Sequence, residues 1–125
     1  MQWLWVAFGG ALGASCRYAL SLYISKNIDS TFPWATWCIN LLGCFFAGVF
    51  FACSQKYPFL ANEARLLLMI GVLGGFTTFS SFGLETFLLL KSAQFSTAIL
   101  YAFSSLLLGI LVLALGFYLM EFSLK

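Results

Sequence analysis

The sequence contains no histidine and very little charge. Six basic and four acidic residues make up only 8% of the 125 residues, whereas hydrophobic residues make up 62%. A chain of this length has room for one small domain, and it has too few polar residues to cover a water-soluble core. The composition therefore predicts a single membrane-embedded domain over residues 1–125.

The missing histidine also limits the possible chemistry. A hydrolase needs a serine or cysteine beside a base, and a proton relay needs paired acid and base groups within the membrane. Neither arrangement is present, so we expect no enzyme activity. The cysteines have no CxxC spacing and no histidine to complete a metal site, and we interpret all four as small packing residues: Cys16, Cys38, Cys44 and Cys53.

Long apolar runs take the place of the missing charge. Each is near or above the ~20 residues that an α-helix needs to cross ~30 Å of hydrocarbon. No alternating strands of the outer-membrane barrel type are present, and no basic leader precedes the first run, which we expect to be retained. We therefore expect an all-α membrane protein with four transmembrane helices, at approximately Trp3–Tyr23, Pro33–Cys53, Leu66–Leu90 and Thr97–Met120.

The charge between the runs gives no clear orientation. Four spans place both chain ends and the second loop on one side of the membrane, together with Lys56, Arg65 and Lys125. Lys26 and Lys91 fall on the other side. Because the basic residues are nearly balanced between the two sides, the positive-inside rule does not predict one orientation. We therefore expect insertion in both orientations and antiparallel pairing of two copies. A single orientation fixed by the weak loop charges is the alternative.

Small residues recur at a spacing of four within the runs. This spacing lets helix backbones approach closely, within one chain or between two copies, and we expect both. Four helices do not readily enclose a water-accessible path, which also favours a homodimer. The pairs are Gly9 with Gly13, Gly43 with Ala47, Cys44 with Gly48, Gly71 with Gly75, and Ser105 with Gly109.

Polar residues inside a span are costly and are therefore candidates for function. Arg17 lies late in the first run, where its side chain either snorkels outward or holds positive charge at a water-filled entrance. Asn40 lies near the middle of the second run, with Thr36 one turn earlier and Gly43 about one turn later on the same face. It either bonds a neighbouring helix or lines a pathway.

The third run contains the stretch GVLGGFTTFSSFGLE, residues 71–85. Gly74 and Gly75 weaken the helix, and the hydroxyls of Thr77 and Thr78 can satisfy backbone groups that a break would free. Non-helical backbone is tolerated at this depth only when it is buried in protein or lines a cavity. A broken helix offers carbonyl oxygens to a cation at one end and N–H groups to an anion at the other.

Side chains beyond the break favour an anion. Phe79 and Phe82 share one helix face, and Thr78, Ser81 and Glu85 follow a neighbouring face. Aromatic ring edges carry positive charge, so ring edges and hydroxyls together contact a small anion without holding it tightly, as conduction requires. Packing alone is the alternative for the two rings, since the chain has fifteen phenylalanines.

These residues resemble the Fluc-type fluoride channels of bacteria. Three signatures of that family recur in order: GGALGASCRY at 9–18, INLLGCFFAG at 39–48 and GGFTTFSSFGLE at 74–85. The stretch GGxTTFS within a membrane span is the most specific of them, and the likeness runs through all four apolar runs. Two positions depart from the pattern: Ala35 stands where a glycine is common, and Ser81 where a threonine is usual.

The resemblance implies an antiparallel, dual-topology homodimer in the bacterial inner (cytoplasmic) membrane. Two pathways in each dimer would let fluoride leave the cell passively. By position, Phe79 and Phe82 would contact fluoride, Asn40 would be an amide donor lining the pore, and Arg17 would lie at the vestibule.

The resemblance also implies a structural sodium ion, held by the backbone carbonyls of Gly74 and Thr77 from both copies. Two inverted copies of a broken helix would bring four such oxygens together, and bare carbonyls would otherwise be costly in a dry core.

Further polar positions follow from the resemblance in the third and fourth helices. Those of the third helix are Thr78, Ser81 and Glu85, and in the fourth we expect Ser104 or Ser105 to contribute hydroxyls.

Two other functions compete with a channel. A small multidrug-type proton-coupled exporter would also be short and dually inserted, but it needs a carboxylate early in its first span, and residues 3–16 contain none. Glu85 is its only substitute. A purely structural subunit has no reason to place a glycine break, an asparagine and hydroxyls at depth. No repeated helix pair suggests a rocking transporter, so a passive channel is favoured.

Overall fold

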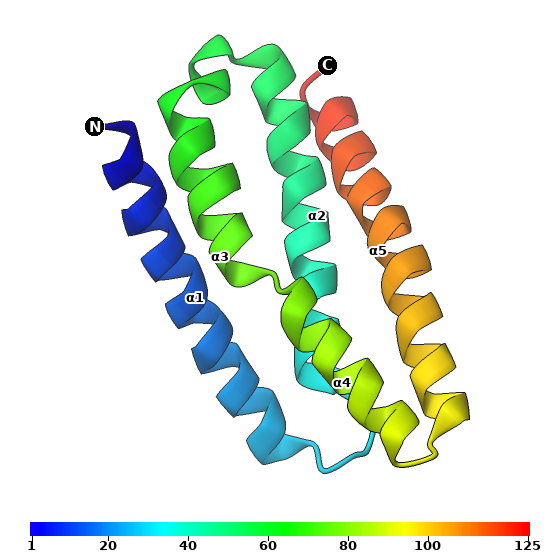
Figure 1. Cartoon of the computed structure of the whole chain (residues 1–125). Helices are drawn as coiled ribbons and strands as arrows, with labels where there is room; N and C mark the ends of the chain where they lie inside the picture. The colour runs from blue at the N-terminus through cyan, green and yellow to red at the C-terminus, as the bar shows by residue number, and fades with distance from the viewer.

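The computed structural model describes residues 1–125 and is helical throughout, as the sequence predicts. The chain passes up and down the molecule so that both termini lie at the same end (Figure 1). The elements are α1 (Gln2–Asn27), α2 (Trp34–Lys56), the 3-10 helix η1 (Pro58–Ala61), the π-helix η2 (Arg65–Leu73), α3 (Gly74–Phe76), α4 (Phe79–Lys91) and α5 (Phe95–Ser123).

Three segments are long and apolar enough to cross a membrane: Trp34–Lys56, Arg65–Lys91 and Phe95–Ser123. They correspond to the last three of the four predicted runs. α1 has 26 residues, but it is less apolar and is not among the three. It lies along η2 and α3 for much of its length (Figure 1).

Glycines bring α1 and the third segment into backbone contact. A Cβ atom on Gly71 would lie 2.8 Å from the Cα of Gly9, and one on Gly75 would lie 2.6 Å from the carbonyl oxygen of Gly10. No side chain fits at these distances, so the small-residue spacing of the sequence serves close packing within one chain.

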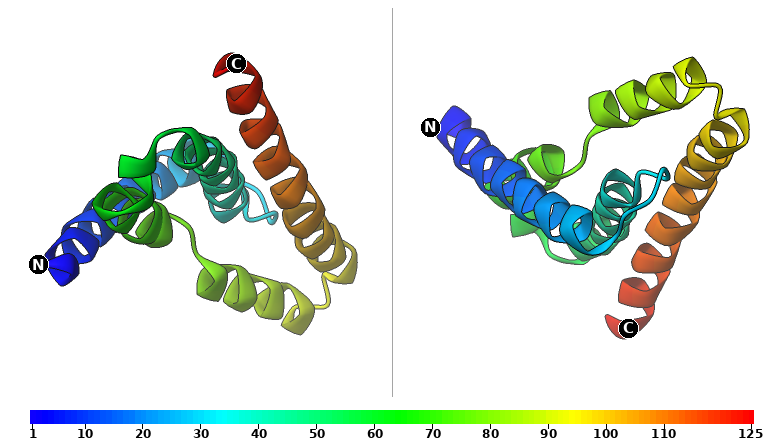
Figure 2. Two further views of the ribbon diagram at one scale, coloured as in Figure 1. Left: turned by 90° about the horizontal axis from the view of Figure 1, so that it is seen from above. Right: turned by 90° about the horizontal axis from the view of Figure 1, so that it is seen from below.

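The third segment is broken at Thr77 and Thr78, whose ψ angles of 158° and 120° are extended. A broken helix is what the sequence predicts. The break lies two residues beyond the glycines, since Gly74 itself is helical, with φ −63° and ψ −37°. Gly75 makes room for α1, and the chain leaves the helix only at Thr77. Beyond the break, α4 swings away from α1 and α3 towards α5 (Figure 2).

α2 and α5 lie side by side and run in the same direction. The indole Nε1 of Trp37 donates to Ser104 Oγ at 3.0 Å, and further along, the Sγ of Cys44 lies 3.5 Å from the Cβ position of Gly109. Successive turns of α2 therefore face successive turns of α5.

The contact between α1 and α3 can be tested by adding one methyl group. In Gly13→Ala the new Cβ would lie 2.8 Å from the backbone nitrogen of Phe76, so we expect a loss of roughly 1–3 kcal/mol of stability from overpacking. Gly10→Ala is the matched control, because nothing lies within 4 Å of its Cβ position. Melting temperatures of the two variants in detergent give the comparison, and equal values would contradict the packing described.

Candidate functional site

A side chain from α2 holds the break in the third segment. The Nδ2 of Asn40 donates to the carbonyl oxygen of Thr78 at 2.9 Å, and the backbone N–H of Thr78 donates to Asn40 Oδ1 at 2.8 Å. The carboxamide therefore matches one backbone donor and one backbone acceptor where the helix supplies neither. One Nδ2 proton is used in this pair, and the second remains for another acceptor.

Threonine hydroxyls satisfy further groups at the break. Thr77 Oγ1 donates to the carbonyl oxygen of Leu73 at 3.0 Å. Thr78 Oγ1 accepts from the backbone N–H of Ser81 at 3.2 Å, which caps the N-terminus of α4, and lies 3.3 Å from Ser80 Oγ. The prediction that hydroxyls serve backbone groups freed by the break is confirmed for Thr78. It is wrong for Thr77, because the Leu73 carbonyl still accepts the backbone N–H of Thr77 at 3.0 Å.

Two carbonyl oxygens lose their helical partners at the same place. In a continuous helix, the N–H of Thr78 would donate to Gly74 and the N–H of Ser81 to Thr77. Both donors are diverted, to Asn40 and to the Thr78 hydroxyl, and neither carbonyl accepts a backbone hydrogen bond. These are the two carbonyls predicted to hold sodium. Free carbonyl oxygens suit a hard cation, so the residues fit that ion.

Glu85, the acidic residue well inside the third segment, accepts two hydroxyl hydrogen bonds. Thr36 Oγ1 donates to Oε1 and Tyr101 Oη to Oε2, each at 2.7 Å. Thr36 and Tyr101 are both buried, Tyr101 completely. A carboxylate inside a membrane span is costly unless hydrogen-bond donors satisfy it, and Thr36 and Tyr101 supply those donors.

Thr36 and Tyr101 were not predicted as site residues, although the sequence holds a signal for both. Thr36 precedes Asn40 by one turn on α2, and Tyr101 precedes Ser105 by one turn on α5. Because the two helices lie side by side in the same direction, these pairs form two parallel polar rows. Glu85 joins the rows at their first turn.

The two serines predicted in the fourth helix have different surroundings. Ser104 Oγ accepts from Trp37 and donates to the carbonyl oxygen of Tyr101 at 3.3 Å, so it is engaged on both sides. Ser105 Oγ is buried and has no hydrogen-bond partner. Ser105 is therefore the serine whose hydroxyl is free to contact something else.

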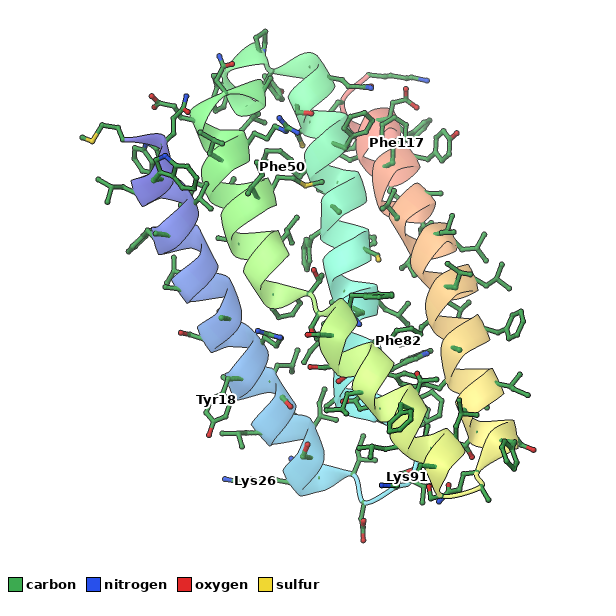
Figure 3. The ribbon with its side chains drawn as sticks, viewed as in Figure 1. Tyr18, Lys26, Phe50, Phe82, Lys91 and Phe117 are labelled. Carbon is green, nitrogen blue, oxygen red and sulfur yellow. The ribbon has the colours of Figure 1, made fainter.

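The two predicted phenylalanines lie next to one another but differ in burial. The ring of Phe82 stacks on Tyr101, with centroids 5.1 Å apart and planes 18° apart, and its centroid lies 5.8 Å from that of Phe79. Phe82 lies between α4 and α5 (Figure 3). Phe79 is 84% exposed, so nothing in this chain covers most of its ring.

A cavity of about 370 Å³ opens beside the break. Its lining includes Asn40, Thr78 and Phe79, and also the residues of the two free carbonyls, Gly74 and Thr77. We call it the break cavity. It brings the amide, the aromatic ring and the carbonyl oxygens to one space.

Six predicted residues lie outside the break cavity: Arg17, Ser81, Phe82, Glu85, Ser104 and Ser105. Arg17 is half-buried on α1, and Ser81 lies in the first turn of α4; neither lines the break cavity. Glu85 also lies outside it, one turn beyond Ser81.

The hold of Asn40 on the break can be tested without measuring transport. Removing the carboxamide in Asn40→Ala leaves the N–H and carbonyl of Thr78 unpaired. Two hydrogen bonds, each worth roughly 0.5–1.5 kcal/mol net, are lost, so amide exchange over residues 77–81 rises by about tenfold.

Hydrogen exchange with mass spectrometry measures this rise. Asn27→Ala is the control, since Asn27 bonds only Tyr23 at the end of α1, and it should leave residues 77–81 unchanged. Unchanged protection in Asn40→Ala would show that the amide does not hold the break.

Comparison with known proteins gives a consistent result over nearly the whole chain. Residues 4–117 match the family described as CrcB-like protein, Camphor Resistance (CrcB). The chain is 47% identical over 116 residues, 93% of its length and 91% of the relative, to a "Fluoride-specific ion channel FluC" of Thermus thermophilus. It is 38% identical to the protein of the same name from Methylobacillus flagellatus over 125 residues, 99% and 98% of the two chains. A third relative of that name, from Acidobacterium capsulatum, is 42% identical over 93% of each chain.

Proposed function

From the membership of this chain in the family of CrcB-like proteins, we propose that it is a passive, fluoride-selective ion channel of the bacterial inner membrane. Its relatives carry the name of fluoride-specific ion channels and come from bacteria. Three of its helical segments are long and apolar enough to cross a membrane, so it is a multi-pass membrane protein. A channel converts no substrate, and the chain is not an enzyme.

The observation that carries the proposal is the set of hydrogen-bond donors at the break and along the two polar rows. Fluoride is small and strongly hydrated, so it enters a protein only where donors replace its water. Asn40 keeps one free amide proton at the break cavity, and Ser105 keeps an unpaired hydroxyl. The edges of Phe79 and Phe82 add partial positive charge. None of these groups is a full cation, so the ion is contacted without being trapped.

The route we propose follows the two polar rows. Fluoride moves from the break cavity along the Asn40 and Thr36 side of α2 and the Ser105 and Tyr101 side of α5. At the end of the rows, Thr36 and Tyr101 donate their hydroxyls to Glu85. Fluoride must compete with that carboxylate for the same donors.

Thr78 and Ser81 belong to the start of this route on α4. The hydroxyl of Thr78 caps the helix, and the hydroxyl of Ser81 adds a donor one turn before Glu85. Arg17 supplies positive charge outside the break cavity, on α1, in the role of the vestibule residue.

A second, inverted copy completes the proposed channel. Phe79 is 84% exposed in the single chain, which is a poor arrangement for a pore-lining ring unless another chain covers it. Basic residues also divide almost evenly between the two ends, and Lys26 and Lys91 both lie at the same end (Figure 3).

α1 contacts η2 and α3 backbone to backbone, so we include α1 as the fourth membrane crossing.

Sodium is the proposed partner of the two free carbonyls. Gly74 and Thr77 would each supply one oxygen per copy, and the ion would neutralise carbonyl dipoles that no backbone donor satisfies. Its contribution is structural: it would hold the two broken helices against each other at the dimer axis.

The multidrug-type exporter has no observation in its favour. Its only available carboxylate, Glu85, accepts hydrogen bonds from two buried hydroxyls.

Fluoride selectivity is tested in liposomes. Purified protein with a voltage shunt should release fluoride far faster than chloride. Phe82→Ile should lower fluoride efflux by about tenfold or more, equivalent to ~1.4 kcal/mol, because it removes an aromatic ring whose edge carries positive charge. Phe87→Ile is the control: Phe87 is also on α4 and is 59% exposed, whereas the ring stacked on Tyr101 is that of Phe82. Equal halide rates, or equal loss in both variants, would refute the proposal.

Dual insertion is tested by labelling single cysteines in a background without the native four. Positions Ser30 and Asn62 lie in loops at opposite ends of the chain fold. An impermeant thiol reagent applied from one side should label about half of the protein at each position, because the loop charges favour neither orientation. Complete labelling of one position and none of the other would show a single topology.

A further inference from the structure

A second cavity, of about 340 Å³, opens where α1 ends and α2 begins. It shares no residue with the break cavity. Its lining is rich in hydroxyl groups, and it contains two acidic residues and no basic one: Ser21, Ser25, Ser30, Thr36, Asp29 and Glu85. We call it the serine cavity.

The serine cavity reaches the polar rows at the end away from the break. Thr36 and Glu85, which are joined by a hydrogen bond of 2.7 Å, both line it. The break cavity holds Asn40, one turn along α2 from Thr36. The proposed route therefore runs between two cavities that are separated by about one helical turn.

Aromatic rings surround Tyr101 at this end of the polar rows. Phe32 packs edge-on against Tyr101, with centroids 5.5 Å apart, and its ring lies 6.0 Å from that of Trp37. Phe82 stacks on the Tyr101 ring. Tyr101 is thus enclosed by rings, whereas Glu85 faces the serine cavity directly.

Ser21, Ile24 and Ser25 form the α1 wall of this cavity. Ser21 and Ser25 are four residues apart and share a helix face. Serines also occur where membrane helices pack on each other, but Ser21 and Ser25 line a cavity, where a hydroxyl can contact water or an ion.

We propose that the serine cavity is the second mouth of the fluoride pathway, and that Ser21 and Ser25 of α1 line it as hydroxyl donors. This inference rests on the proposed function. The mouth carries the carboxylates of Asp29 and Glu85 and no basic side chain. An anion there meets neutral donors and is repelled by the acids, so it leaves readily, as conduction requires.

Thiol modification tests the mouth. In Ser25→Cys, a charged methanethiosulfonate reagent attached in detergent, before reconstitution, places a bulky group in the cavity. Complete modification, verified by intact mass, should then lower fluoride efflux from liposomes at least fivefold relative to the unmodified variant. We expect the same loss of fluoride efflux for modified Ser21→Cys, which replaces Ser25→Cys in the test if that variant expresses poorly.

Ser96→Cys is the matched control. Ser96 is an exposed serine in the first turn of α5, at the same end of the molecule, and it does not line the cavity. Its modification should leave efflux unchanged, as should treatment of the wild-type protein.

Full modification at Ser25 or Ser21 without loss of efflux would overturn the inference, and so would an equal loss at Ser96. These outcomes require a conducting wild-type protein, so they differ from failure of the proposed function, in which the wild-type protein itself releases no fluoride.

Discussion

The reciprocal hydrogen bonds between Asn40 and the backbone of Thr78 are the constraint on which the rest of the structure depends. A membrane span can leave the helix only where each freed backbone group finds a partner. The carboxamide offers a donor and an acceptor in one plane, so it replaces two missing helical bonds at once. Without it, the extended residues at the break would return to the helix or draw in water.

The hydrogen bonds of Asn40 and of the Thr78 hydroxyl leave free acceptors on one side of the break and free donors on the other. By taking the N–H of Thr78, Asn40 leaves the carbonyl of Gly74 bare, and the hydroxyl of Thr78 does the same to the carbonyl of Thr77. Acceptors are thus left on one side of the break, where a cation fits. Donors remain on the other side, around Phe79, where an anion fits.

Much of this could be predicted from the sequence, because hydropathy and the cost of polar groups in lipid are local properties. The apolar runs, the interruption near Thr77 and the capping hydroxyls follow from such arguments. The sequence places Thr36 and Tyr101 each one turn before a predicted polar residue. It does not place them against Glu85, which they meet only through the register of three helices. Adjacent serines on α5 differ by about 100° in direction, so packing alone decides that Ser104 faces Trp37. The spacing of Gly71 and Gly75 predicts a close helix contact, but it could not identify the partner, because α1 is distant in sequence.

The most direct test of the account is the rate of fluoride efflux through Asn40→Ala reconstituted in liposomes. If the amide both holds the break and supplies a donor to the ion, efflux falls by about tenfold or more, or ~1.4 kcal/mol, while the variant still purifies as a folded species. Efflux at the wild-type rate from such a protein would contradict the claim that fluoride passes at this break.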